Sequence, residues 1–134
     1  MKSKARNEQR KIIMTTLYQI FLFENKEGII KIDEFIDEVT KNEDKFVKDT
    51  IDGILERRRE IDELANSYLN DWTIDRLGKI DQVIIRMGIY EILYTDTPDL
   101  VCIDEAIELA KQYSDDAVRK MINGVLDKVY HNKK

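Results

Sequence analysis

The chain has 134 residues, a formal net charge of −5, one proline and five glycines. A chain of this length is typical of one domain, which buries about two-thirds of its unfolded surface without disulfide support. So few turn formers, with 43% apolar and 37% charged residues, argue against an all-β protein and predict an all-α protein. The acidic balance also argues against a general binder of polyanions.

The composition argues against a metal site, a disulfide, a nucleophilic active site and a membrane span. The single cysteine, Cys102, cannot form an internal disulfide, and its apolar neighbours predict a small core residue. One cysteine and one histidine cannot build a zinc site or a nucleophile–histidine pair, and the scattered glycines form no phosphate loop. We therefore expect no enzyme and no cofactor. No apolar run approaches the ~18 residues of a membrane span, and no signal-peptide pattern is present, so we expect a cytoplasmic protein.

The first predicted helix, residues 2–23, carries two kinds of side chain on one face. Arg6 and Arg10 lie on the same line of the helical wheel as Leu17. A buried face does not normally change from arginine to leucine, so we expect the basic end to protrude beyond the core. Residues 1–11 hold five cations and one carboxylate, which suits a local phosphate contact. A solvated charged terminus is the simpler alternative.

The middle of the chain shows apolar stripes at helical spacing, separated by polar breaks. Gly53, inside one stripe, suits a close helix crossing. The Arg57–Arg59 triplet points in three directions and is followed by acids, which favours a solvated surface over an RNA site. We expect Trp72 to be a core or seam residue, with base stacking as the less favoured alternative. These predicted helices and a short turn cover residues 29–40, 43–55, 61–69 and 73–77.

Residues 79–94 form the most apolar predicted helix, which therefore belongs at the centre of the fold. Arg86 and Glu91 interrupt it and are interpreted as partners in interhelical ion pairs. Pro98 ends the segment, and two further amphipathic helices follow, with a cap near Asp115. Gly124, inside the last helix, again suits close packing. The total is about six to seven helices, in halves near residues 1–70 and 73–134 that share one core.

The last third of the chain resembles the C-terminal signature of the NusB family of bacterial transcription antitermination proteins. The resemblance rests on IDEAIELAKQY at residues 103–113 and KMINGVLDK at residues 120–128. It continues in Ala5–Arg6, Arg10 and residues 17–19, and in residues 77–86 and 89–92. The resemblance therefore covers the whole chain.

This resemblance implies a helical bundle of two packed helical subdomains, forming a single RNA-binding domain over residues 1–134. It also implies binding to boxA RNA together with the small-subunit ribosomal protein NusE. The expected setting is the RNA polymerase antitermination complex with other Nus factors, chiefly on ribosomal RNA operons. Two alternatives stay open. One is a protein-interaction or homodimerisation module without direct RNA binding, and the other is the accessory RNA-binding domain of an RNA methyltransferase.

The resemblance also assigns candidate sites. The family's RNA-contacting positions correspond here to Lys2, Arg6, Arg10, Lys120 and Met121. The surface for the ribosomal protein corresponds to Tyr18 and Asp81. Relatives often carry further arginines where this chain has Asn7 and Glu8, and many carry an aromatic where Met121 stands. Both differences predict weaker RNA binding alone and greater dependence on the protein partner.

Overall fold

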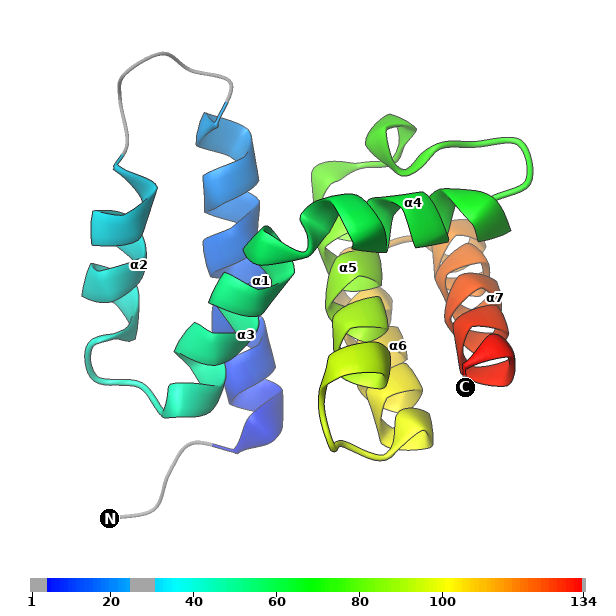
Figure 1. The fold of residues 1–134 in the computed structure, drawn as a ribbon. Helices are drawn as coiled ribbons and strands as arrows, with labels where there is room; N and C mark the ends of the chain where they lie inside the picture. Colours follow the sequence, from blue (N-terminus) through cyan, green and yellow to red (C-terminus); the bar gives the residue numbers. More distant parts are fainter. Residues whose placement is uncertain (1–4, 25–30, 134) are drawn as a thin grey trace.

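The computed structural model describes residues 5–24 and 31–133. Within these ranges every regular element is helical, which confirms the all-α prediction (Figure 1). The elements are α1 (Arg6–Phe23), α2 (Ile32–Thr40), α3 (Lys45–Glu56), α4 (Arg58–Tyr68), the 3₁₀ helix η1 (Ile74–Arg76), α5 (Lys79–Tyr94), α6 (Asp99–Tyr113) and α7 (Asp116–Asn132). None of the helices in these ranges is long and apolar enough to cross a bilayer.

The helices form two groups joined by α4 (Figure 1). Helices α1, α2 and α3 pack together, α5, α6 and α7 pack together, and α1 lies antiparallel to α5 where the groups meet. Helix α4 contacts α3, α5 and α7, so it bridges the groups rather than closing the first. One continuous set of buried apolar side chains runs through both groups.

Helix α5 is the centre of the molecule, as its apolar sequence predicts. Every residue from Gln82 to Ile89 is buried, and α5 packs against α1, α3, α4, α6 and α7. A Cβ atom at Gly88 would lie 2.7 Å from a methyl of Leu126, so glycine allows α7 to approach closely. Gly53 plays the predicted role at α3, since a Cβ there would lie 2.1 Å from the Tyr90 hydroxyl. Packing of this kind fixes α5 between its neighbours.

The two buried charged side chains of α5, Arg86 and Glu91, find charged partners on other helices, which confirms their interpretation as ion-pair residues. The Arg86 guanidinium donates to the Asp62 carboxylate of α4 at 2.7 and 3.0 Å and lies 4.6 Å from the ring centroid of Phe21. Glu91 accepts from Arg10 of α1. Because buried charge is costly unless paired, these bonds specify which helices meet.

Two interpretations from the sequence are wrong. Trp72 is 50% exposed rather than a core residue, because the segment between α4 and η1 crosses the surface. Gly124 is exposed, and a Cβ there would meet no atom within 4 Å, so it serves no helix contact in this structure. By contrast, the predicted cap is present, with the Asp115 carboxylate accepting from the backbone N–H of Val118 at 2.9 Å.

Candidate nucleic-acid interface

Arg6 stands at the exposed start of α1, where it is held by neighbouring side chains. Its guanidinium lies 3.9 Å from the ring centroid of Phe46 on α3 and donates to Oε1 of Gln9 at 2.7 Å. Buried Gln9 in turn donates to the carboxylate of Asp44 at 2.7 Å. A guanidinium stacked on an aromatic ring retains donors for a second anion. Arg6 is therefore a positively charged group whose direction is set before any ligand arrives.

Arg10 is in a different environment from Arg6, and the expectation that it protrudes is wrong. Its side chain is 4% exposed, and its Nε and Nη2 donate to the two carboxylate oxygens of Glu91 at 2.9 and 2.7 Å. Glu105 of α6 lies 3.7 Å from Nη1. Burial alone would lower the pKa of Arg10, but the hydrogen bond and charge of Glu91 outweigh it and raise that pKa. The wheel places Arg10 on the buried face correctly, and α5 supplies its counter-charge.

The two α7 residues assigned to RNA lie apart from Arg6. Lys120 is exposed and Met121 half-buried near the start of α7, whereas Lys2 lies outside the described residues. The starts of α1 and α7 are at opposite ends of the molecule (Figure 1). The length of the molecule between these ends is comparable to that of α5, whose 16 residues span about 24 Å. A ligand that contacts both ends must therefore be extended rather than compact.

The two residues assigned to a protein partner lie toward a common end of the molecule. Tyr18 is half-buried in the later part of α1, and Asp81 is in the first turn of the antiparallel helix α5. Asp81 accepts a hydrogen bond from the hydroxyl of Ser114, which follows α6. The structure therefore separates these two residues from Arg6 and leaves both partly accessible.

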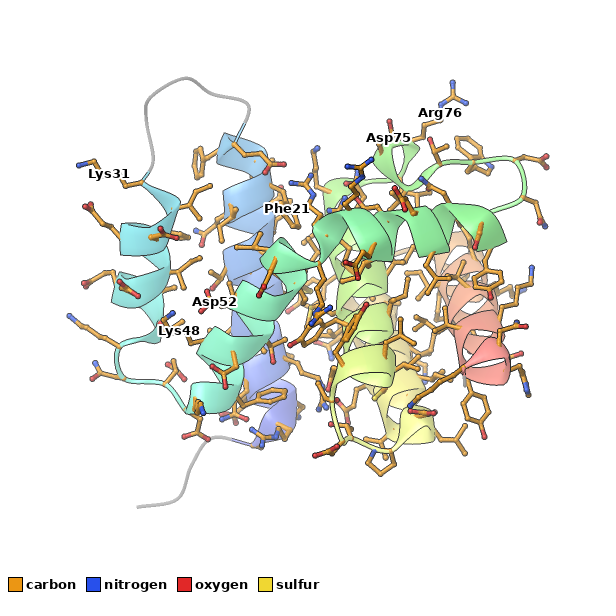
Figure 2. All side chains as sticks on the ribbon, in the orientation of Figure 1. Phe21, Lys31, Lys48, Asp52, Asp75 and Arg76 are labelled. Atoms are coloured by element: carbon orange, nitrogen blue, oxygen red, sulfur yellow. The ribbon has the colours of Figure 1, made fainter. Side chains whose placement is uncertain are left out.

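Most basic side chains of the described residues are paired with carboxylates. The Arg57–Arg59 triplet pairs with Glu60, Glu24 and Glu63, which confirms its interpretation as a neutralised surface. The pair of Lys48 and Asp52 at 2.7 Å is visible on α3 in Figure 2. The described cations with no carboxylate oxygen within 4.0 Å are Arg6, Lys11, Arg76, Lys79, Lys120 and Lys128.

These unpaired cations lie at four places along the chain: the start of α1, η1, the start of α5, and α7. The side chain of Arg76 extends away from the helices (Figure 2). In an acidic protein, separate unpaired cations of this kind offer local contacts to an anion rather than a broad basic surface. This distribution depends on which acids fold beside which bases, so sequence spacing alone did not reveal it.

Two kinds of reactive group, a metal cluster and a free thiol, can be checked in the described residues. Across residues 5–24 and 31–133, no group of three or more His, Cys, Asp or Glu side chains is arranged to hold a metal. Cys102 is buried, as predicted, and burial raises the pKa of its thiol to about 12. A thiol that stays protonated at neutral pH is a poor nucleophile.

Residues 7–131 match the family model described as the NusB family. The chain belongs to the NusB family. The resemblance found in the sequence is therefore confirmed. The transcription antitermination protein NusB of Campylobacter jejuni strain RM1221 is 43% identical over 132 residues, covering 97% of this chain and 98% of that protein. The NusB of Macrococcus caseolyticus is 38% identical, covering 96% of this chain and 98% of that protein.

Solved NusB structures share the fold. The structure of T. maritima NusB superimposes with a TM-score of 0.83 and 31% identity, covering 98% of this chain and 94% of that chain. A crystal structure of the antitermination factors NusB and NusE in complex with double-stranded RNA gives a TM-score of 0.76 and 25% identity. It covers 94% of this chain and 96% of that chain.

Proposed function

We propose that this chain is a bacterial transcription antitermination factor that binds boxA RNA together with the ribosomal protein NusE. It works in the cytoplasm, within the antitermination complex of RNA polymerase and other Nus factors, and supports transcription of ribosomal RNA operons. Its relatives of about 40% identity carry the name transcription antitermination protein. A NusB of the same fold has been crystallised with NusE and RNA. A binding protein, not an enzyme, fits the chemistry described above.

The observation that carries the proposal is the free, oriented guanidinium of Arg6. The side chain is exposed, has no carboxylate partner among the described residues, and is held by Phe46 and Gln9. Phosphate contacts supply much of the affinity of proteins for nucleic acids, and each one releases counterions. Arg6, with Lys11 nearby and Lys120 on α7, contributes this phosphate-binding charge. Lys2, outside the described residues, adds to it in the proposal.

Arg10 has a different role in this proposal. Its donors are engaged by Glu91 and its side chain is buried, so it positions the start of α1 and contacts no phosphate. Met121, half-buried beside Lys120, adds apolar contact to the bases. Of the three N-terminal cations assigned to RNA, this proposal keeps Arg6 and Lys2 as phosphate contacts and gives Arg10 a positioning role.

The NusE surface includes Tyr18 and Asp81 in this proposal. Both lie toward the end of α1 and α5 that is opposite Arg6, so one molecule accommodates the protein and the RNA phosphates on separate areas. Replacing Tyr18 by aspartate should weaken NusE binding while preserving the RNA salt dependence. Circular dichroism would separate this result from misfolding, since Tyr18 also packs against the core.

The decisive experiment is a salt titration of boxA RNA binding with NusE present. If Arg6 contacts a phosphate, Arg6→Ala should reduce the slope of log affinity against log salt by about 0.7 for single-stranded RNA. Arg59→Ala is the matched control, because the Arg59 side chain is 92% exposed but paired with Glu63. Its slope should equal that of the wild type.

Two results would contradict the proposal. An unchanged slope in Arg6→Ala would remove this residue from the phosphate contacts. NusE binding or self-association without boxA binding at any salt concentration would instead favour a protein-interaction module.

A further inference from the structure

The loop after α4 and the middle of α7 enclose a surface hollow of about 290 Å³. Trp72 and Tyr68 contribute aromatic side chains, and Met121, Gly124 and Lys128 contribute the α7 side. The remaining lining residues are Leu69, Asn70, Asp71 and Val125. This hollow is called the Trp72 hollow below. It combines aromatic surface with a cation, on the same helix as the proposed contact residues Lys120 and Met121.

The side chain of Trp72, the single tryptophan of the chain, is half exposed. It also lines a second, more open hollow together with Thr73 and Arg76. An aromatic side chain that is accessible from two hollows has ring surface free for a planar ligand. Stacking on such a ring stabilises an unpaired nucleobase with little dependence on its identity.

The charges around Trp72 favour an anionic ligand. Lys128, which lines the Trp72 hollow, and Arg76, which lines the second hollow, have no carboxylate partner among the described residues. Asp71 is the acidic member of the lining, so the site is a local contact and not a broad basic track. A planar ring flanked by free cations matches a nucleotide, which has a flat base joined to a phosphate.

Gly124 supplies an independent observation. A glycine inside a helix costs about 1 kcal/mol relative to alanine. No neighbouring residue requires glycine here, because a Cβ would meet no atom within 4 Å. Gly124 lines the Trp72 hollow, so its missing side chain widens that hollow. Close approach of a ligand to backbone is one established use of glycine.

From these observations we propose that the Trp72 hollow binds one unstacked base of single-stranded RNA. The base stacks on the indole of Trp72, and the adjoining phosphate lies near Lys128. This inference rests on the proposed function, and it names a base-binding subsite that the phosphate contacts at Arg6 do not provide. Because the starts of α1 and α7 lie at opposite ends of the molecule (Figure 1), a strand that contacts both Arg6 and the Trp72 hollow must be extended.

Fluorescence of the single tryptophan tests the proposal directly in the wild-type protein. The probe is single-stranded boxA RNA, titrated with NusE present and, separately, absent. Stacking of a base should quench Trp72 fluorescence at saturation. A duplex of the same sequence, whose bases already stack on one another, should quench it less. Unchanged fluorescence with bound single-stranded RNA, or equal quenching by the duplex, would overturn the proposal. Quenching by NusE alone would assign the hollow to the protein partner and would also overturn it.

Affinity measurements provide the second test. Trp72→Leu should weaken boxA binding by roughly tenfold, whereas Trp72→Phe should retain most of it, because phenylalanine keeps a stacking face. Gly124→Leu should weaken binding by filling the hollow. Leu100→Ala is the control, since Leu100 is a 60% exposed apolar residue at the start of α6. Wild-type affinity in both Trp72→Leu and Gly124→Leu would overturn the proposal.

The outcomes distinguish this inference from the proposed function. If RNA binds and Arg6→Ala reduces the salt slope as expected, but the fluorescence of Trp72 does not change, only the base-binding subsite is rejected. Absence of any RNA binding would reject both.

Discussion

The carboxylate of Glu91 on α5 accepts two hydrogen bonds from the guanidinium of Arg10 on α1, at 2.7 and 2.9 Å, and both side chains are buried. This pair joins the two groups of helices across the centre of the molecule. It also explains why Arg10 cannot be treated as a second copy of Arg6. The two residues are one helical turn apart, yet Arg10 forms a buried ion pair whereas Arg6 is a charge at the surface.

Arg10→Met should destabilise the protein by about 3–5 kcal/mol, because Glu91 would remain buried without its partner. The double variant Arg10→Met/Glu91→Leu should recover most of this loss, since it removes both buried charges. Urea unfolding measures both effects, with Arg59→Ala as a surface control expected within about 0.5 kcal/mol of the wild type. Wild-type stability in Arg10→Met would contradict the assigned role of this pair.

The same double variant separates positioning from RNA contact. If Arg10 only holds α1, Arg10→Met/Glu91→Leu should keep the wild-type salt slope for boxA binding. A slope reduced as in Arg6→Ala would show that Arg10 reaches phosphate in the complex.

Phe46→Leu should weaken RNA binding through Arg6, because it removes the ring on which the guanidinium lies. We expect a loss of about threefold, corresponding to the 0.5–1 kcal/mol of an exposed cation–π contact. The effect should vanish in an Arg6→Ala background. An equal loss in both backgrounds would instead indicate a general packing effect of Phe46.

Gly53→Ala and Gly124→Ala form a matched pair of mid-helix substitutions with opposite expected signs. At Gly53 the new methyl would overlap the Tyr90 side chain, which should destabilise the protein by about 1–3 kcal/mol. At Gly124 it meets no atom, so the better helix propensity of alanine should stabilise by up to about 1 kcal/mol. Thermal unfolding of the two variants compares them directly. Stabilisation at both positions would show that Tyr90 moves aside at little cost.

Stability should fall above about pH 9 partly because of Cys102. Burial raises the pKa of the folded thiol from 9.0 to about 12, so the unfolded chain loses this proton first. The contribution is complete below pH 9 and declines by up to about 1.4 kcal/mol per pH unit as the pH rises toward 12. Cys102→Ala should unfold with a weaker pH dependence in this window. Identical slopes for the two proteins would contradict the raised pKa.

Hydrophobic periodicity determined the helical class, the central position of α5 and the buried role of Cys102, because these follow from local spacing and composition. Motif resemblance determined the family. Periodicity also indicated that Arg86 and Glu91 need ionic partners, since isolated buried charges are unstable. The identities of those partners, Asp62 and Arg10, come from helices far away in sequence.

Only the tertiary structure decided which polar and aromatic groups stay free. Arg6 and Arg10 share a face of one helix, but the approach of Glu91 buries Arg10, while Phe46 supports Arg6 at the surface. Trp72 and Gly124 look like core residues by type and spacing, yet the path of the loop after α4 leaves both beside an open hollow. Residue type sets the free-energy cost of burying or exposing a side chain. Long-range packing decides which side chains come into contact, and local sequence does not specify those tertiary contacts.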